Sequence, residues 1–346
     1  MLGKNIKYYR LKKNMSIREL ASEINVSPMT VSNYERDARK PGMDMIKALA
    51  KALDIRVSDF LEDHGNSLQF VHGEFRKNVR LTKTKQEYIR EAVEEYFSRF
   101  FEVVEILGGK TLGEPPKTHT LTLQDDVEAN AKKLREYLHL PASGPVGNLI
   151  EALENQGILV MFLNIDDDDF SGMNGTVNGR PYIVINSNMS AERIRSTLVH
   201  ETSHFAFAWP ESIQEQENEK MATAISGAFL FPEDDAFREL GGRRTAVTND
   251  MISVCQEYGI SMFLLVKRAN ICRIISDAAA KDFYIRASRA GWRKAEPERT
   301  AKERPGLFSQ LVYRAVCEND ITVQKGAELL KQPYETVQKQ CAAIGG

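Results

Sequence analysis

The chain has 346 residues, enough for two or three domains, and its 42% hydrophobic and 27% charged residues are ordinary for globular protein. The net charge of −2 gives no indication of a polyanionic partner for the whole chain, but the charge is unevenly distributed. Residues 1–60 carry twelve Lys or Arg and seven Asp or Glu, a net charge of +5, which leaves −7 on the remainder. This asymmetry predicts a nucleic-acid-binding end joined to a different module.

The cysteines and the N-terminus point to a cytoplasmic protein. Cys255, Cys272, Cys317 and Cys341 form no C-x-x-C pair, so neither a disulfide framework nor a thiolate zinc knuckle is expected. The N-terminus lacks the apolar segment of a signal peptide, and no run approaches the length of a membrane span. We therefore expect a cytoplasmic location and no membrane partner.

Two short helices are predicted between residues 16 and 36. Ser16 and Glu19 form an S-x-x-E capping box at the start of the first helix. A turn at residues 25–26 follows, and Ser27 is suited to cap a second helix with Pro28 at its first position. Two helices joined by so short a turn indicate a helix-turn-helix.

Over about sixty residues this segment resembles the Cro/phage-repressor (Xre) type of DNA-binding domain. The resemblance implies a small five-helix fold whose second motif helix enters the major groove of double-stranded DNA. The residues it places at base edges are Met29, Thr30, Ser32 and Asn33. Those it places at phosphates are Arg10, Lys13, Arg39 and Lys40. It also implies a homodimer on paired half-sites of an operator; the alternative is a helical hairpin that makes protein contacts.

The middle of the chain predicts helices followed by a small sheet. Residues 61–82 break the helical period and are interpreted as a connector. The helices expected after it cover about residues 85–107, 123–141 and 144–157, and a buried strand is expected at 158–165. Asn178-Gly179 marks a hairpin turn before a second strand at 182–186. The acidic run 166–169 lacks the spacing of a calcium loop and is interpreted as a solvated loop.

The stretch "STLVHETSHFAF" contains an H-E-x-x-H pentapeptide, residues 200–204, on a helix predicted to begin after Ser190. At about 100° per residue, His200 and His204 lie roughly 40° apart on one helix face, so both imidazoles can reach one ion. Glu201 can reach a water on that ion but not the ion itself. This is the pattern of a zinc hydrolase; the alternative is two surface histidines with local hydrogen bonds.

A catalytic zinc site needs a third protein ligand, and acids cluster at the start of the next predicted helix. Glu219 on that helix can complete a His₂Glu set of the gluzincin sort. Glu215 and Glu217 are the alternatives, although acids at a helix N-terminus also have a simple dipole explanation. For the donor to the developing oxyanion, Tyr182 is one candidate, with ordinary packing as the alternative.

The strand "RPYIVIN", the pentapeptide helix and the segment from Glu219 to Pro232 resemble the ImmA/IrrE metallopeptidase family over about residues 75–280. The resemblance implies one Zn²⁺ per chain held by His200, His204 and Glu219, with Glu201 as general base and acid. It also implies a protein substrate of the repressor class. Two residues depart from the family pattern: Ser203 stands where glycine is usual and Thr223 where asparagine is usual, which affects turnover more than metal binding.

The C-terminal part is predicted to be helical. Residues 258–261 form the turn of a helix pair that resembles a second helix-turn-helix, and similar pairs close the peptidase fold in the family. Residues 286–306 are basic, polar and punctuated by proline, as in a linker. The tail that follows is interpreted as a partner-docking piece, a dimerising piece or a cap on the core, and the sequence does not decide among these.

Together these features predict an α+β, mostly helical chain with an all-α helix-turn-helix domain, a zincin-like peptidase domain containing a small sheet, and a helical tail. The expected boundaries are 1–62, a linker at 63–82, the peptidase domain at 83–280 and the C-terminal region at 281–346. The expected function is a DNA-binding transcriptional regulator whose zinc endopeptidase cleaves a repressor- or antitoxin-type protein, or itself near residues 61–82, to control stress-response or mobile-element genes. The alternative is a non-proteolytic regulator that uses the peptidase fold as a sensor or scaffold in prophage or toxin–antitoxin control.

Overall fold

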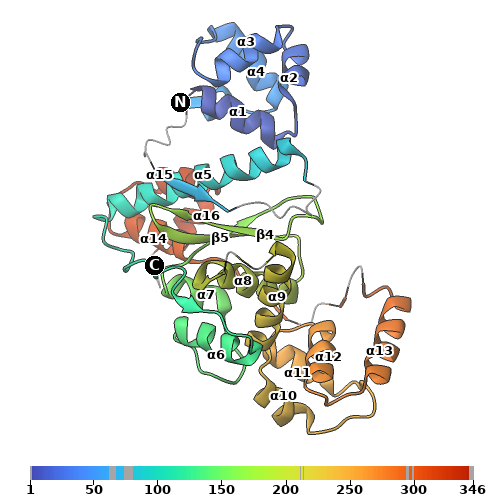
Figure 1. The fold of residues 1–346 in the computed structure, drawn as a ribbon. Coiled ribbons are helices and arrows are strands. Elements are labelled where there is room, and N and C mark those ends of the chain that lie inside the picture. The colour runs from blue at the N-terminus through green and yellow to red at the C-terminus, as the bar shows by residue number, and fades with distance from the viewer. Residues whose placement is uncertain are drawn as a thin grey trace. The chain divides into compact units, whose positions relative to one another are not determined.

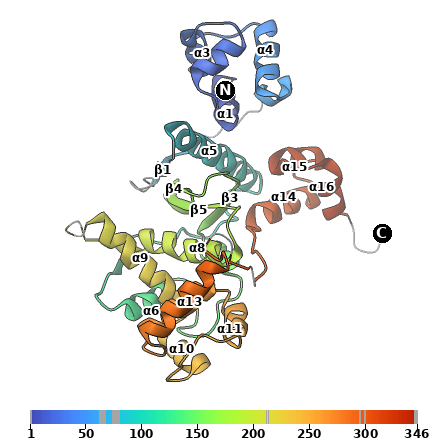
Figure 2. The ribbon, with the colours of Figure 1, turned by 90° about the vertical axis from the view of Figure 1, so that its right-hand side faces the viewer.

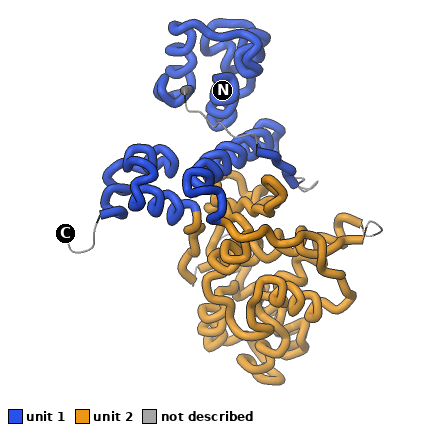
Figure 3. Tube along the Cα trace, turned by 90° about the vertical axis from the view of Figure 1, so that its left-hand side faces the viewer, with its two compact units in different colours: residues 1–111, 308–346 blue, residues 112–307 orange. Residues whose placement is uncertain are grey.

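The computed structural model describes residues 2–61, 68–73, 81–210, 212, 214–293, 296–297 and 300–342. The chain divides into two compact units, of which unit 1 comprises residues 1–111 and 308–346 and unit 2 comprises residues 112–307 (Figure 3). Of the predicted linker 63–82, the structure describes only residues 68–73 and 81–82, so most of it lies outside the described residues.

Unit 1 begins with the predicted helix-turn-helix segment. Its elements are α1 (Leu2–Lys12), α2 (Ile17–Glu23), α3 (Pro28–Glu35), α4 (Met43–Leu53) and the 3₁₀ turn η1 (Val57–Leu61). The Ser16 and Glu19 side chains each bond the other's backbone N–H, which confirms the predicted capping box. A small core closes the fold, and its members at 0% exposure include Ile6, Leu20, Val31 and Leu49.

The rest of unit 1 is organised around one long helix. α5 (Lys83–Ile106) follows the short strand β1 (Phe70–His72), and the C-terminal helices are α14 (Leu307–Cys317), α15 (Val323–Leu330) and α16 (Tyr334–Gln340). The Phe308 ring of α14 lies 5.2 Å from the Tyr96 ring and 5.4 Å from the Phe100 ring of α5. These aromatic contacts attach the C-terminal helices to α5.

Unit 2 contains the predicted sheet. β5 (Arg180–Asn186) pairs antiparallel with β4 (Gly172–Val177) and parallel with β3 (Leu159–Leu163). The predicted hairpin is confirmed, because Asn178 and Gly179 both take the positive φ that a tight two-residue turn requires. Two two-residue strands, β2 (Leu121–Thr122) and β6 (Phe207–Ala208), pair in parallel, and β6 directly follows the pentapeptide helix.

Helices make up most of unit 2. They are α6 (Val127–Tyr137), α7 (Leu149–Asn155), α8 (Ala191–Ala206), α9 (Glu215–Leu230), α10 (Glu233–Leu240), α11 (Met251–Tyr258), α12 (Met262–Ile271) and α13 (Asp277–Arg289). α8 packs against β4 and β5 on one side and α9 on the other (Figure 1). The helix that bears the pentapeptide is therefore at the centre of the unit.

The predicted fold class is confirmed: the chain is mostly helical, with a small mixed sheet in the part that follows the helix-turn-helix. The compact units do not follow the predicted boundaries, however. α5 belongs to unit 1 instead of the peptidase part, and α13 extends across the expected boundary at residue 280. Among the residues that the structure describes, no helix combines the length and apolarity needed to cross a membrane.

Candidate metal centre and nucleic-acid interface

The pentapeptide helix α8 is held by its cap and its apolar face. The Ser190 hydroxyl accepts the backbone N–H of Arg193 and so satisfies one open donor of the first turn. Ile194, Leu198 and Phe205 are buried in the core of unit 2, as their spacing predicts. Burial of this face directs the other face, which bears the two histidines, toward α9.

Three nitrogen and oxygen donors converge where α8 meets α9. The His200 Nε2 and His204 Nε2 atoms are 3.0 Å apart, and the Glu219 carboxylate oxygens lie 3.4 Å and 3.2 Å from them. A tetrahedral zinc ion with bonds of ~2.0–2.1 Å holds its ligand atoms about 3.3 Å from one another. The spacing of these donors therefore fits a single small divalent cation.

Of the acids proposed as third ligand, the structure brings only Glu219 to the histidines. Among the described residues, the one group of three or more His, Cys, Asp or Glu side chains that could hold a metal is His200, His204 and Glu219. Glu215 and Glu217 lie exposed in the first turn of α9. Negative charge there interacts favourably with the helix dipole, which accounts for their position without a metal.

Glu201 is buried beside the three donors and is held by a neighbour from the sheet. Its side chain is 4% exposed, and the Asn174 amide of β4 donates a 2.8 Å hydrogen bond to its Oε2. This bond fixes the carboxylate in one orientation. The sequence did not reveal Asn174, because no spacing rule connects a residue of the hairpin with a helix 27 positions further on.

The two residues that depart from the family pattern both make local hydrogen bonds. The Ser203 hydroxyl, fully buried, donates to the His200 carbonyl 2.7 Å away, so it is turned toward its own helix. The Thr223 hydroxyl donates to the Glu219 carbonyl and lies 3.4 Å from His200 Nδ1. Because that hydroxyl proton is engaged, an Nδ1–H of His200 can donate to Thr223, which leaves Nε2 as the metal-binding nitrogen.

Two further aromatic residues, Trp209 and Tyr182, differ in their relation to the site. The Trp209 ring lies 5.6 Å from the His204 ring, and its indole N–H donates to the Ser203 carbonyl. Trp209 thus forms a wall of the site that no motif predicted. Tyr182, considered as an oxyanion donor, is at 0% exposure in the central strand β5.

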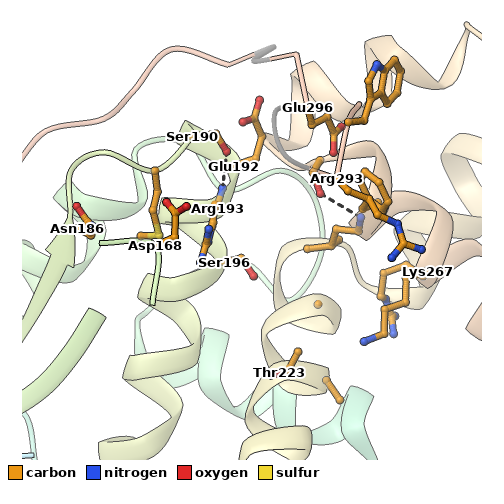
Figure 4. A pocket seen from close by; sticks show the side chains of 18 of the residues that line it. Asp168, Asn186, Ser190, Glu192, Arg193, Ser196, Thr223, Lys267, Arg293 and Glu296 are labelled. Atoms are coloured by element: carbon orange, nitrogen blue, oxygen red, sulfur yellow. Dashed lines mark hydrogen bonds between the residues drawn. The ribbon is translucent and has the colours of Figure 1, made fainter. Parts of the chain in front are cut away.

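A cavity of about 660 Å³ opens beside the metal-binding residues, within unit 2. Ser196 of α8, Thr223 of α9 and Lys267 of α12 line it, and Figure 4 shows them with Asp168 and Arg193 around one hollow. Ser196 is one helical turn before His200, and Thr223 is one turn after Glu219. The volume is in the range of ligand-binding pockets, and the lining mixes charged, polar and apolar side chains.

The predicted base-reading residues lie on α3 of unit 1. Met29 is 64% exposed, and Thr30, Ser32 and Asn33 are partly exposed. The Thr30 hydroxyl is 2.9 Å from the Ser27 hydroxyl at the helix cap. The structure thus places all four on the accessible part of the helix, where a DNA groove can approach them.

One predicted phosphate contact is wrong. Arg10 is 3% exposed, and its guanidinium donates to both Glu35 carboxylate oxygens and to the Met15 carbonyl. It therefore stabilises the interior of the domain and cannot meet a phosphate. Of the other cations, Lys13 donates to the Ala52 carbonyl, and Arg39 and Lys40 are exposed.

Comparison with protein-family models gives two matches in separate parts of the chain. Residues 6–60 match the model described as helix-turn-helix, and residues 153–270 match the model of the IrrE N-terminal-like domain. The second match includes both His200 and Glu219, together with the strands beneath them. No curated relative matches the chain.

Proposed function

We propose that this chain, a helix-turn-helix domain fused to an IrrE-like domain, is a DNA-binding regulator whose second domain is a zinc-dependent endopeptidase. The convergence of His200, His204 and Glu219 on one point supports this most directly, since their donor atoms lie within 4.8 Å of one another. Its substrate would be a repressor- or antitoxin-type protein. The chain would act as a homodimer on a double-stranded operator and control stress-response or mobile-element genes.

In this proposal the two imidazoles and the Glu219 carboxylate hold one Zn²⁺. When bound, zinc supplies Lewis acidity that lowers the pKa of water and polarises a carbonyl group. Three protein ligands leave a fourth position for water or substrate, which distinguishes a catalytic site from a closed structural one. The hydrogen bond between His200 Nδ1 and Thr223 keeps the imidazole in the tautomer that this role requires.

Glu201 moves the proton. Its carboxylate accepts a proton from the attacking water and delivers it to the nitrogen of the departing amine. The Asn174 amide, bound to Oε2, holds the carboxylate in place during both transfers. Burial of Glu201 among protein groups also excludes bulk water, which strengthens its interaction with the reacting atoms.

The neighbouring cavity supports a peptide substrate. It lies within one helical turn of the metal-binding residues on both α8 and α9, and it is lined by apolar side chains such as Phe263 and by charged ones such as Lys267. A peptide presents both kinds of side chain along its length. We propose that residues flanking the scissile bond occupy this cavity.

The experiment compares zinc-loaded wild type with Glu201→Gln, which keeps the size of the side chain and all three metal donors. Glu217→Gln, an exposed acid at the start of α9, is the matched control. Each protein is incubated alone and with repressor-type proteins that carry a helix-turn-helix domain, and the products are measured by intact mass. We expect cleavage by wild type and Glu217→Gln and a loss of about 10²–10⁴-fold in Glu201→Gln.

Metal content and DNA binding of the same proteins complete the test. All three are expected to contain one zinc per chain and to bind an operator duplex equally. If the wild type contains zinc and regulates transcription identically to Glu201→Gln, the peptidase proposal fails. The domain then acts as a sensor or scaffold.

A further inference from the structure

The C-terminal helices α14, α15 and α16 have no role in the proposed function. Figure 2 shows them as a group of three short helices at the end of the chain. α15 and α16 pack on each other and are connected by a short turn. This pair has a counterpart among the other short helix pairs of the chain.

The helix caps and the turn residue of the α15–α16 pair have the same spacing along the chain as those of the α2–α3 pair. In both, nine positions separate the N-cap of the first helix from a residue in the left-handed conformation, and two more lead to the N-cap of the second helix. The equivalent residues are Ser16, Asn25 and Ser27 in the first pair and Thr322, Lys331 and Pro333 in the second. The left-handed φ angles are 55° at Asn25 and 52° at Lys331.

The two turns are also closed by the same hydrogen bond. The N–H of Val26 donates to the carbonyl of Ala21 at 2.9 Å, and the N–H of Gln332 donates to the carbonyl of Ala327 at 3.1 Å. Alanine occupies the equivalent position in both first helices. Fifteen residues after each first cap stands a valine at 0% exposure, Val31 in α3 and Val337 in α16. The α15–α16 pair is therefore a helix-turn-helix, with α16 in the place of the groove-entering helix.

A third pair, α11–α12, shows that the helix-turn-helix spacing alone does not produce a DNA-binding surface. Gly259 has a φ of 61°, and the Ile260 N–H donates to the Cys255 carbonyl at 3.0 Å, as in the other two turns. Of the residues of α12 that correspond to the reading positions, Phe263, Leu264 and Val266 are partly or fully buried, and only Lys267 is exposed. Phe263 stacks on Tyr284 with ring centres 5.9 Å apart, and Val266 is at 0% exposure.

α16 differs from α12 because its outer face is open. Val337 is its only buried residue, and the other six are exposed. Those that correspond to the proposed reading positions of α3 are Glu335, Thr336, Gln338 and Lys339. Glutamine can bond an adenine edge with two hydrogen bonds, threonine can touch a thymine methyl group, and lysine can bond guanine or a phosphate.

α5 holds this pair beside the N-terminal helices in unit 1. Lys325 pairs with Glu102 at 2.6 Å and Lys331 with Glu95 at 2.8 Å, both on α5. The Lys331 ammonium also lies 5.5 Å from the centre of the Tyr8 ring of α1. α16 is thus continuous, through α15 and α1, with the domain that contains α3.

A second set of ion pairs anchors α1 to the same helix. Lys4 pairs with Glu94 at 2.9 Å and Lys7 with Glu91 at 2.7 Å. Residues 322–342 carry three Lys and two Glu, a net charge of +1, although the whole chain is at −2. The ion pairs hold α1 and the α15–α16 pair on the same helix, and the local charge of residues 322–342 does not oppose a polyanionic partner.

We propose that α15–α16 is a second DNA-reading module, and that α16 contacts double-stranded DNA next to the segment bound by α3. One chain then reads two stretches of a duplex. This extends the operator beyond what the N-terminal domain alone recognises, and it does not depend on peptide cleavage.

The test uses the full-length protein and duplexes selected by wild type from a pool with a random 40-base-pair centre. The variant Thr336→Ala/Gln338→Ala removes two exposed reading side chains and no charge. Its matched control, Arg314→Ala/Glu318→Ala, removes an exposed ion pair of α14 and leaves the net charge unchanged. Thermal unfolding of each protein verifies that the fold is intact.

We expect hydroxyl-radical footprints of wild type and control to cover two adjacent stretches. The Thr336→Ala/Gln338→Ala variant should lose one of these and bind at least about tenfold more weakly, since two base contacts are removed. Glu335→Gln should bind more tightly than wild type by about twofold or more, because removal of a negative charge from the reading helix reduces its repulsion by the DNA backbone. If the footprint and affinity of the double variant equal those of the control, α16 does not contact DNA and the proposal is overturned, whatever other partner α16 has.

The DNA footprint distinguishes failure of the second DNA-reading module from failure of the peptidase proposal. Glu201→Gln should leave the footprint unchanged, so failure of the peptidase proposal leaves the second module intact. Asn33→Ala on α3 should remove the other stretch of the footprint. If Asn33→Ala alone abolishes the entire footprint and Thr336→Ala/Gln338→Ala has no effect, the N-terminal domain is the only DNA-binding part.

Discussion

The metal-binding cluster on α8 and α9 and the exposed face of α3 differ in what holds their side chains. In the cluster, Glu201 is 4% exposed and accepts a hydrogen bond from Asn174. The Thr223 hydroxyl lies 3.4 Å from His200 Nδ1. On α3, Met29 is 64% exposed. Buried polar groups need partners, so the protein itself determines their geometry. Exposed groups instead adopt their geometry on meeting a ligand.

The same contrast explains why sequence patterns predict the two regions unequally. A metal-binding motif specifies side chains that must converge, and helix geometry makes them do so. A reading helix specifies only which side chains are accessible. Arg10 demonstrates the limit: in sequence it is one of many cations near a DNA-binding motif, but in the structure it is an interior residue paired with Glu35.

Arg10→Ala should have the largest effect. It leaves the Glu35 carboxylate buried without its guanidinium, and breaking a buried pair in this way costs about 3–5 kcal/mol. We expect chemical denaturation to show this loss for the isolated transition of the N-terminal domain, with DNA binding lost as a consequence. Asn33→Ala should weaken DNA binding without changing the free energy of unfolding. Equal stability of Arg10→Ala and wild type would mean that Arg10 is a surface residue after all.

Glu219→Ala should have the second-largest effect, on metal binding. It removes one of three direct zinc ligands, so its effect should exceed the ~10–100-fold loss typical of residues that only support a ligand. We expect purified Glu219→Ala to contain less than a tenth of the zinc of wild type, measured by elemental mass spectrometry. Glu215→Ala, an exposed acid in the same helix, should retain full metal content. Retention of zinc by Glu219→Ala at the wild-type level would exclude Glu219 as a ligand.

Asn174→Ala tests the support of Glu201. Loss of its 2.8 Å hydrogen bond frees the carboxylate to rotate, and we expect the rate of peptide cleavage to fall by about 10–100-fold. Zinc content should remain at one per chain, because no metal donor is touched. Asn155→Ala, an exposed amide at the end of α7, serves as the control. A loss of zinc in Asn174→Ala would show that Asn174 acts on the metal site as a whole.

The smallest effect is expected for Glu154, a half-buried acid of unit 2 whose Oε2 accepts the backbone N–H groups of Gly306 and Leu307. Burial raises its pKa to about 7, although those two hydrogen bonds oppose the shift. A raised carboxyl pKa means that the folded state holds a proton which the unfolded state releases near pH 4.5. Stability from this group is therefore fully present below pH 4.5, and it is lost as the pH rises from there through 7. Glu154→Gln should unfold like wild type at pH 4 and be about 1 kcal/mol more stable at pH 8, measured by urea denaturation; no pH-dependent difference would show that Glu154 titrates normally.

The sequence predicted more of the metal cluster than of its surroundings. The H-E-x-x-H spacing and the helical period of α9 were sufficient to bring Glu219 into consideration, but Glu215 and Glu217 remained open until the fold placed them in the first turn. Asn174 and Trp209 approach from another strand and from beyond the helix end. No local period reports such contacts, because they depend on how the chain folds back on itself.

By itself, the sequence determined the local elements: the capping box at Ser16, the Asn178-Gly179 turn and the face shared by His200 and His204. These depend on interactions within a few residues, so composition and spacing are enough to specify them. Only the tertiary structure decided which acid meets the imidazoles, which arginine is interior, and which two of the three similar helix pairs have an open face. Burial and long-range packing decide these features, and residues far apart in the chain contribute to both.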